Sequence, residues 1–296
     1  MAEKELLLVI ETTGAKASVA LIDKKGVCRQ LTSEDAMNHL RHLIPMIDKL
    51  LCTGGKRLGD LCGIAVSEGP GSFTGIRIGM ATAGSLAQAL DLPVVGVPTL
   101  ESFVYHAPAA KAIISPIFDA RRNQIYAGAY AWDNDGSYHN LIQDKAYDLP
   151  EYINLLRRVL SDGSGNHFLD HDFASTSVTA ATATFETNCA TGCAHHGRET
   201  LEEVLEGTAE TDIPLECDIV LFGDGIKPYG EQIRQELHPY RVEFAEETAR
   251  YQNAASVALL ARRLWEQGKQ KSLYDLHPVY LRKAEAQRKL EEAAGK

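Results

Sequence analysis

The residues best placed to bind a ligand or a partner in this sequence form the loop Gly69-Pro70-Gly71-Ser72-Phe73-Thr74-Gly75. This loop lies between an apolar run and a long helical pattern. Its glycines let backbone N–H groups approach an anion or another chain, and Ser72 or Thr74 can cap the following helix. The spacing does not fit a nucleotide motif. A Walker loop needs Gly-Lys-Ser/Thr, and a dinucleotide fingerprint needs its third glycine one position earlier. A tight turn before a helix is the plain alternative.

Four metal-ligating side chains lie close together later in the chain. Two thiols and two imidazoles occur at Cys189, Cys193, His195 and His196. Their spacing fits no zinc pattern well, because adjacent histidines rarely bind one ion together. We favour the alternative, an irregular loop without a metal.

The elements that must position these residues occur in the same order twice. Apolar runs bounded by turns predict strands, and longer patterned runs predict helices. The order strand, strand, strand, helix, strand, helix predicts two similar α/β subdomains, each a mixed sheet flanked by helices. The predicted elements are 6–10, 17–22, 27–31, 34–52, 63–67 and 74–90 in the first half, and 112–118, 124–131, 138–142, 149–160, 218–222 and 227–237 in the second.

Changes in pattern divide the chain into three segments. Residues 1–106 form the predicted N-terminal subdomain, residues 110–250 the C-terminal subdomain, and residues 251–296 a segment of C-terminal helices. Residues 162–216 interrupt the second repeat with a stretch that is low in large apolar side chains. We interpret this stretch as a loop-rich insertion.

The composition is ordinary for a globular protein, with 45% hydrophobic and 24% charged residues. No apolar run approaches the ~18 residues of a membrane span, and the acidic N-terminus is unlike a signal peptide, so we expect no membrane association. Six cysteines without a disulfide-scaffold spacing favour a reducing cytoplasm. The net charge of −10 argues against the chain binding nucleic acid mainly by itself, because neutralising phosphates requires clustered Lys and Arg.

The helix predicted after the glycine-rich loop carries unusually few charges. One side has enough apolar and small residues to cover a sheet, and the opposite side of such a helix is normally charged. A helix without charge on any side is normally buried on all sides. The opposite side here holds Ile78, Ala81, Gly84, Ser85 and Ala89, with Arg77 and Gln88 as its strongly polar residues.

The first predicted helix has a related excess of apolar surface. Two adjacent helices with surplus apolar or small surface predict a helix-on-helix interface with another protein. The alternative is that the insertion or the C-terminus of this chain covers them. The predicted inner stripe is Leu40, Ile44, Ile47 and Leu51, and the predicted outer shoulder is Met46 and Leu50 with His39 beside them.

Motifs along most of the chain resemble those of the TsaB (YeaZ) family. The central match is the sequence GPGSFTGIRIG at 69–79, and the likeness covers residues 5–160 and 217–285 in order. This resemblance implies the duplicated fold of actin, Hsp70 and the sugar kinases, which is ribonuclease H-like, with the helix at 254–265 returning to the first subdomain. The other matching motifs are Ile10-Glu11-Thr12-Thr13, His39 with Leu43-Ile44-Pro45, Gly96-Val97-Pro98-Thr99-Leu100-Glu101, Asp119-Ala120-Arg121-Arg122-Asn123-Gln124-Ile125-Tyr126, Gly223-Asp224-Gly225 and Pro278-Val279-Tyr280-Leu281-Arg282.

In kinases of that superfamily, an acidic residue on the first strand holds a metal, and nearby hydroxyls meet phosphate. By this resemblance Glu11, Thr12 and Thr13, together with Gly223-Asp224-Gly225, could form a residual nucleotide cleft. The structural alternative is that the threonines satisfy a strand end and Gly225 makes a turn. The catalytic paralogue of the family binds its metal with two histidines four residues apart, whereas His39 and His42 are three apart, so we expect no metal in this chain.

The resemblance implies a non-catalytic subunit in the synthesis of threonylcarbamoyladenosine, on the tRNA adenosine next to the anticodon. Such a subunit forms a heterodimer with a metal-containing TsaD subunit and activates it, and a TsaE ATPase docks across their junction. ATP and metal are then expected in the partner subunits, and tRNA is reached only through the complex. The interface is expected to comprise His39, Met46, Leu50, Gly69, Pro70, Gly71, Ser72, Phe73, Thr74, Gly75, Arg77, Ile78, Ala81, Gly84 and Ser85.

Three other functions remain open at this stage. An ATP-using phosphotransferase of the same fold would need Glu11 and Asp224. A metallopeptidase would need a HEXXH motif or an equivalent ligand cluster, which the sequence lacks. A homodimeric structural protein could use the same two helices, and such a homodimer could also form whenever the partner is absent.

Overall fold

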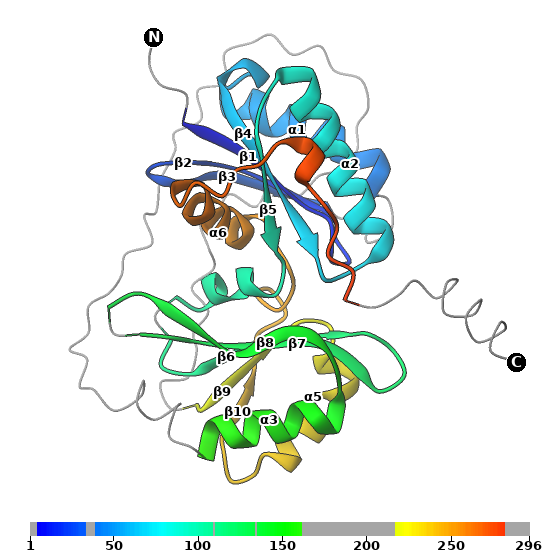
Figure 1. Cartoon of the computed structure of the whole chain (residues 1–296), viewed down its shortest axis with the longest axis vertical. Helices are drawn as coiled ribbons and strands as arrows, with labels where there is room; N and C mark the ends of the chain where they lie inside the picture. Colours follow the sequence, from blue (N-terminus) through cyan, green and yellow to red (C-terminus); the bar gives the residue numbers. More distant parts are fainter. Residues whose placement is uncertain (1–4, 34–38, 109, 134, 162–216, 282–296) are drawn as a thin grey trace, which may run out of the picture.

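The structure, a computed structural model, describes residues 5–33, 39–108, 110–133, 135–161 and 217–281, and for residues 39–42 it describes the backbone alone. Two α/β subdomains lie one above the other (Figure 1). The first sheet contains β1 (Leu6–Glu11), β2 (Ser18–Asp23), β3 (Gly26–Thr32), β4 (Leu61–Gly69) and β5 (Val94–Pro98). The second contains β6 (Ile113–Asp119), β7 (Gln124–Trp132), β8 (Tyr138–Asp148), β9 (Ile219–Phe222) and β10 (Val242–Phe244).

The two sheets have the same topology. Their strand orders are β3-β2-β1-β4-β5 and β10-β9-β6-β7-β8, which are one order when the second is read in reverse. In each sheet the first strand is central, and it pairs antiparallel with the next strand of the chain and parallel with a later one. This repetition confirms the prediction of two similar α/β subdomains, each a mixed sheet flanked by helices.

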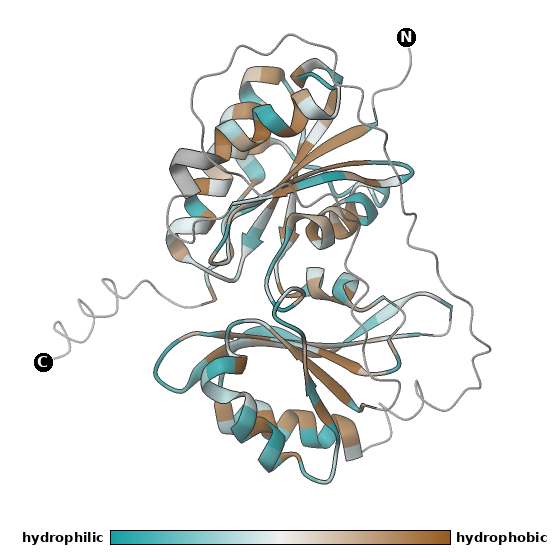
Figure 2. Cartoon of the chain, turned by 180° about the vertical axis from the view of Figure 1, so that it is seen from behind, coloured by the Kyte–Doolittle hydropathy of each residue, from teal (hydrophilic) through white to brown (hydrophobic). Residues whose placement is uncertain are grey.

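Helices cover both faces of the first sheet. Alternate side chains of a strand point to opposite faces, so Leu8 and Ile10 of β1 pack in the core beneath α1 (His39–Thr53) and α2 (Phe73–Leu90). Leu7 and Val9 point to the other face, which α6 (Ala254–Glu266) covers. A strand buried on both faces requires a continuous apolar run, and Figure 2 shows such hydrophobic runs along the central strands.

The second sheet packs its outer face on two helices and its inner face on the subdomain junction. Ile113 and Ile117 of β6 contact the core beneath α3 (Leu149–Ser161) and α5 (Ile226–Glu236). Phe118 and Ile114 point the other way, toward the 3-10 segment η2 (Glu101–His106) that links the sheets. None of the helices in these described ranges is long and apolar enough to cross a membrane.

His106 ties the subdomains together from the end of η2. Its imidazole is buried, with Nδ1 2.8 Å from the Ala249 carbonyl oxygen and Nε2 2.9 Å from the Ser256 hydroxyl at the start of α6. Phe103 stacks on the ring at 4.4 Å. Burial lowers the pKa of His106 to about 4, so the ring is neutral at neutral pH.

Acidification should therefore weaken this junction. Between pH 6.5 and 4 the unfolded chain binds a proton at His106 and the folded chain does not, so stability falls as pH drops through that window. The contribution of this one group between pH 7 and pH 5 is about 2 kcal/mol. Chemical denaturation at both pH values should show a smaller loss for His106→Gln than for the wild type. An equal loss in the two proteins would contradict this role.

After α6 the chain forms a strap, residues 271–280, along the free edge of the first sheet. Lys271 and Val94 exchange backbone hydrogen bonds of 2.7 and 3.0 Å as an antiparallel bridge with β5. The short segment η3 (Leu273–Asp275) follows, and the Val279 N–H then donates to the Glu68 carbonyl oxygen at 2.7 Å. The strap thus ends beside the N-terminus of α2.

Candidate protein-interaction site

The glycines of the GPGSFTG loop let the start of α2 lie directly against the end of β1. The Thr12 hydroxyl donates to the Gly75 carbonyl oxygen at 2.8 Å, and the Ser72 N–H donates to the Thr13 carbonyl oxygen at 2.8 Å. A Cβ at Gly75 would overlap the Thr12 carbonyl oxygen, and one at Gly71 would lie 2.6 Å from that of Thr13. The Ser72 hydroxyl accepts from the Gly75 N–H and caps the helix, as predicted.

Glu11 is buried beside this contact. Its carboxylate accepts hydrogen bonds from the Thr13 N–H, from the Thr13 hydroxyl at 2.6 Å and from the Ser67 hydroxyl. Burial raises the pKa of the Glu11 carboxyl, while these hydrogen bonds oppose the rise. All three donors belong to the protein, so the arrangement favours the structural alternative for Glu11, Thr12 and Thr13 over a metal-binding role.

The other part of the predicted nucleotide cleft, Gly223-Asp224-Gly225, also forms hydrogen bonds within the chain. The Gly223 N–H donates to the Arg250 carbonyl oxygen at 2.7 Å, and the Gly225 N–H donates to that of Ile117 at 3.0 Å. The Asp224 carboxylate accepts the Asp119 N–H at 3.0 Å, and burial raises its pKa. A phosphate loop needs free N–H groups. The amides of Gly223 and Gly225 are engaged, so this loop favours a structural turn.

The described residues contain no group of three or more His, Cys, Asp or Glu side chains that could hold a metal. The Cys189, Cys193, His195 and His196 cluster lies outside the described residues. The side chains of His39 and His42 lie outside them as well. The metal alternatives at these positions stay predictions.

The outer side of α2 is open to solvent, whereas its inner side is buried. Gly75, Ile76, Gly79, Ala83 and Ala87 are buried, which confirms that this side covers the sheet. On the outer side Phe73, Thr74, Arg77, Ala81 and Ser85 are exposed, and Ile78, Thr82 and Gly84 are half-buried. The outer side is thus apolar or small without being covered, as the scarcity of charge on this helix implied.

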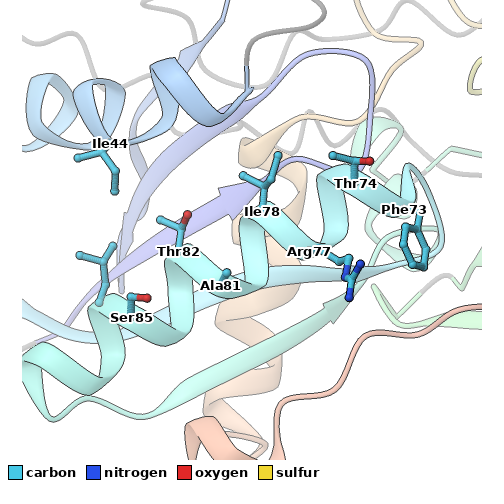
Figure 3. Close-up of a pocket in the computed structure, with 9 residues that line it drawn as sticks. Ile44, Phe73, Thr74, Arg77, Ile78, Ala81, Thr82 and Ser85 are labelled. Carbon is cyan, nitrogen blue, oxygen red and sulfur yellow. The ribbon is translucent and has the colours of Figure 1, made fainter.

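A groove of about 540 Å³ runs between the outer side of α2 and α1. Figure 3 shows Ile44 of α1 pointing toward α2, with Ile78, Thr82 and Ser85 on the facing side. The side chain of Ile44 is 53% exposed. The groove is lined by Ile44, Phe73, Thr74, Arg77, Ile78, Ala81, Thr82, Ser85 and Leu86.

The prediction that Met46 and Leu50 of α1 belong to the interface is wrong. Met46 and Leu50 are fully buried in the core beneath the helix, together with Leu43. At about 100° per residue, Leu43, Met46 and Leu50 form one narrow arc, and that arc faces the sheet. Ile44 lies at the rim of the arc and remains exposed, although it was predicted on the inner stripe. Leu43 was omitted from both predicted stripes. Including it would have indicated that the side of α1 with Met46 and Leu50 faces the sheet.

Part of the glycine-rich loop is also buried. Gly69, Pro70 and Gly75 have little exposed surface, because Thr12 packs on Gly75 and the Val279 carbonyl oxygen lies where a Cβ at Gly69 would be. Their placement in the interface is therefore wrong. Ser72, Phe73 and Thr74 are exposed, Gly71 is half-buried, and the tip of the turn does reach the surface.

Nothing in the described ranges covers the groove. The strap contacts α2 through η3, and the Tyr280 ring packs on Phe73 at the N-terminal end of the helix. No strap residue is among those that line the groove. The alternative that the C-terminus hides this surface therefore fails for residues up to 281. The predicted insertion, 162–216, lies outside the described residues. The exposed site is a helix pair with an apolar groove, which is a surface suited to another protein.

Comparison with known proteins gives matches of two kinds. Residues 26–290 match the family model described as TsaD: tRNA N6-adenosine threonylcarbamoyltransferase. The chain is 34% identical over 151 residues to the tRNA threonylcarbamoyladenosine biosynthesis protein TsaB of Bacillus subtilis, covering 51% of this chain and 66% of that protein. It is 35% identical over 136 residues to the Escherichia coli protein of the same name, covering 45% of this chain and 58% of that protein. These alignments span less than two thirds of the relatives' own lengths.

A solved structure shares the fold along nearly the whole chain. YeaZ from Pseudomonas aeruginosa superposes with a TM-score of 0.60 at 21% identity, covering 93% of this chain and 99% of that one. The two-subdomain architecture thus extends beyond the part of the chain that aligns by sequence.

Proposed function

The chain belongs to the TsaB (YeaZ) family, and from this premise we propose that it is a non-catalytic subunit in the biosynthesis of threonylcarbamoyladenosine on tRNA. In this role it binds a TsaD-like subunit and holds that subunit in its active arrangement. The TsaD-like subunit then transfers threonylcarbamoyl to the tRNA adenosine.

The observation that carries this proposal is the uncovered groove between α1 and α2. The outer side of α2, along this groove, offers Ala81, Gly84 and Ser85, and small side chains let the backbone of a partner helix approach closely. Ile44 and Ile78 add apolar surface that is costly to leave in water. A second helix pair laid into this groove would bury these residues and form a four-helix contact.

A TsaD-like partner fits this surface because this chain and TsaD-like proteins resemble each other in sequence. Residues 26–290 of this chain match the family model of TsaD itself, so a TsaD-like protein is expected to carry corresponding helices on the same kind of sheet. Two related surfaces can then pack about a pseudo-two-fold axis, as in an isologous dimer. The same geometry lets two copies of this chain pair when the partner is absent. We also propose that a TsaE-like ATPase binds where this chain and the TsaD-like subunit meet.

The proposed lack of catalysis rests on the hydrogen bonds at the two parts of the predicted nucleotide cleft. Glu11 is enclosed by Thr13 and Ser67, and the Gly223 and Gly225 amides donate to carbonyl groups of the protein. The net charge of −10 also supports an indirect route to tRNA, because the basic surface must come largely from the partners.

Reconstitution tests this function. The chain, a TsaD-like subunit and a TsaE-like subunit from one source are mixed with tRNA, threonine, bicarbonate, ATP and the enzyme that supplies threonylcarbamoyl adenylate. Modified adenosine is measured by mass spectrometry. We expect at least a tenfold loss of product when the chain is left out, and full product with Asp224→Asn. Product formation that does not depend on the chain would contradict the proposal.

The phosphotransferase alternative makes the opposite prediction. It requires magnesium-dependent ATP turnover by the purified chain alone, and Asp224→Asn would abolish that turnover. We expect no turnover above a buffer control, which the same preparation can establish before reconstitution.

A further inference from the structure

The strap is fixed in place at both of its ends. Its first residue pairs with Val94, and the Val279 N–H donates to the Glu68 carbonyl oxygen. Between them Leu276 packs into the core beneath α1 and α2. The residue after Val279 is therefore held at a defined position beside the start of α2.

That residue, Tyr280, forms an aromatic corner with α2. The Tyr280 and Phe73 ring centroids are 4.7 Å apart, at an interplanar angle of 31°. The guanidinium carbon of Arg77 lies 5.0 Å from the centroid of the Phe73 ring. Phe73 thus contacts both an aromatic ring of the strap and the charged group of the next helical turn. We call Tyr280, Phe73 and Arg77 the corner.

The corner is exposed and continuous with the groove. Phe73 and Arg77 line the groove and lie side by side at the N-terminal end of α2 in Figure 3. The Phe73 and Tyr280 side chains are 41% and 39% exposed. Of six exposed large hydrophobic side chains in the described ranges, five lie on α1, α2 or the strap. Those five are Ile44, Phe73, Tyr274, Val279 and Tyr280.

The guanidinium N–H groups of Arg77 can donate hydrogen bonds to a partner. Its contact in the described part of the chain is with the Phe73 ring, and no carboxylate there lies within ion-pair distance of its guanidinium. The planar N–H fork of a guanidinium matches the two oxygens of a carboxylate. Tyr and Arg are also the side chains most enriched at the energetic centres of protein interfaces.

We propose that the corner receives an acidic side chain of the TsaD-like partner, with Arg77 pairing the carboxylate and Tyr280 holding Phe73 and Arg77 in position. This inference rests on the proposed function and names the chemistry of one end of its docking site. It makes the C-terminal end of the strap, at Tyr280, part of that site, although Tyr280 is far from α2 in the sequence.

Heterodimer affinity, measured by isothermal titration calorimetry with the purified full-length proteins, tests the corner. We expect Tyr280→Ala to weaken binding about tenfold and Tyr280→Phe to bind within twofold of the wild type, because the ring is retained. Arg77→Ala should also cost about tenfold, with a smaller cost in high salt because the lost contact is ionic. The double variant should bind much better than the product of the two losses predicts, since both act through Phe73.

Matched controls separate the corner from general surface effects. Tyr274 lies on the same strap and is 75% exposed without a stack on Phe73, so Tyr274→Ala should bind within twofold of the wild type. Arg121 is an exposed arginine of the second subdomain, and Arg121→Ala should also bind normally. Equal losses from Tyr274→Ala and Tyr280→Ala would overturn the inference.

Failure of the inference is distinguishable from failure of the proposed function. If Gly84→Arg abolishes the heterodimer while Tyr280→Ala and Arg77→Ala bind like the wild type, the groove is the interface and the corner is not part of it. If Gly84→Arg also binds normally, the proposed docking site itself is wrong. Melting temperatures of all variants, measured on the free chain, show that each is folded.

Discussion

Replacing Gly84 with arginine is expected to abolish the heterodimer with a TsaD-like subunit while leaving this chain folded. Gly84 is half-buried on the outer side of α2, and a Cβ at this position would meet no atom within 4 Å. The free chain can therefore point a long side chain into solvent. In the docked state the same side chain would separate the two helix pairs and bury an unpaired charge. We expect affinity to fall at least a hundredfold, which is about 2.7 kcal/mol.

Gly84→Ala is the matched control for that substitution. It adds one methyl group into open space and replaces a glycine inside a helix, which stabilises the folded chain by about 0.5–1 kcal/mol. Its heterodimer should form within a few-fold of wild-type affinity. Sizing chromatography with light scattering gives the complex, and circular dichroism gives the fold. A full-sized complex of Gly84→Arg at micromolar concentrations would show that the partner binds elsewhere.

Replacing Gly75 with alanine should destabilise the first subdomain by about 3 kcal/mol. The new Cβ would overlap the carbonyl oxygen of Thr12, which is backbone and cannot rotate away. Relief requires α2 to move off β1, which breaks the hydrogen bond from the Thr12 hydroxyl to the Gly75 carbonyl oxygen. Urea denaturation of Gly75→Ala against Gly84→Ala gives the measurement, since both changes are Gly to Ala on one helix.

The two glycine variants also separate two interpretations of the loop. If the glycines served to bind phosphate, Gly75→Ala would lose a ligand and keep its stability. The close packing of Thr12 and Thr13 on the loop predicts the reverse. A free energy of unfolding within about 0.5 kcal/mol of the Gly84→Ala value would contradict the packing account.

The inner and outer sides of α2 were predictable from the sequence because the helix is long and its pattern is regular. Gly75, Gly79 and Ala83 recur at helical spacing. Small residues are required there because the helix lies close to the end of β1, where a Cβ at Gly75 or Gly79 would meet Thr12. The unusual lack of charge on the other side is the pattern on which the proposed interface rests. The duplicated order of elements was also predictable, since the central strands β1 and β6 are strongly apolar.

The orientation of α1 was not predictable in the same way. The large apolar side chains of α1 form one continuous arc of about 160°, and the predicted inner stripe and outer shoulder are the two parts of it. Periodicity alone does not say which edge of that arc stays uncovered. The core beneath the helix takes Ile47 and Leu51 of the predicted inner stripe, and with them Leu43, Met46 and Leu50. Ile44 stays outside the core because it lies at the rim of the buried arc, and its side chain points toward α2 (Figure 3).

Features that depend on distant contacts were also missed. β5 and β10 were not predicted, because Val94–Pro98 contains a glycine and a proline and Val242–Phe244 has three residues. Their backbone groups become strand only through pairing with β4 and β9. The strap has no local pattern at all. Its path depends on hydrogen bonds from Lys271 to Val94 and from Val279 to Glu68, partners that are 177 and 211 residues apart along the chain.

Site-specific photo-cross-linking tests the location of the partner most directly. A photoreactive amino acid replaces Ala81 on the outer side of α2 in one variant, and exposed Gln235 on α5 in another. Each variant is mixed with the purified TsaD-like subunit, irradiated and analysed by mass spectrometry. We predict an abundant cross-link to the partner from position 81 and none above background from position 235. A heterodimer that forms without a cross-link from 81, or one that cross-links equally from 235, would contradict the account.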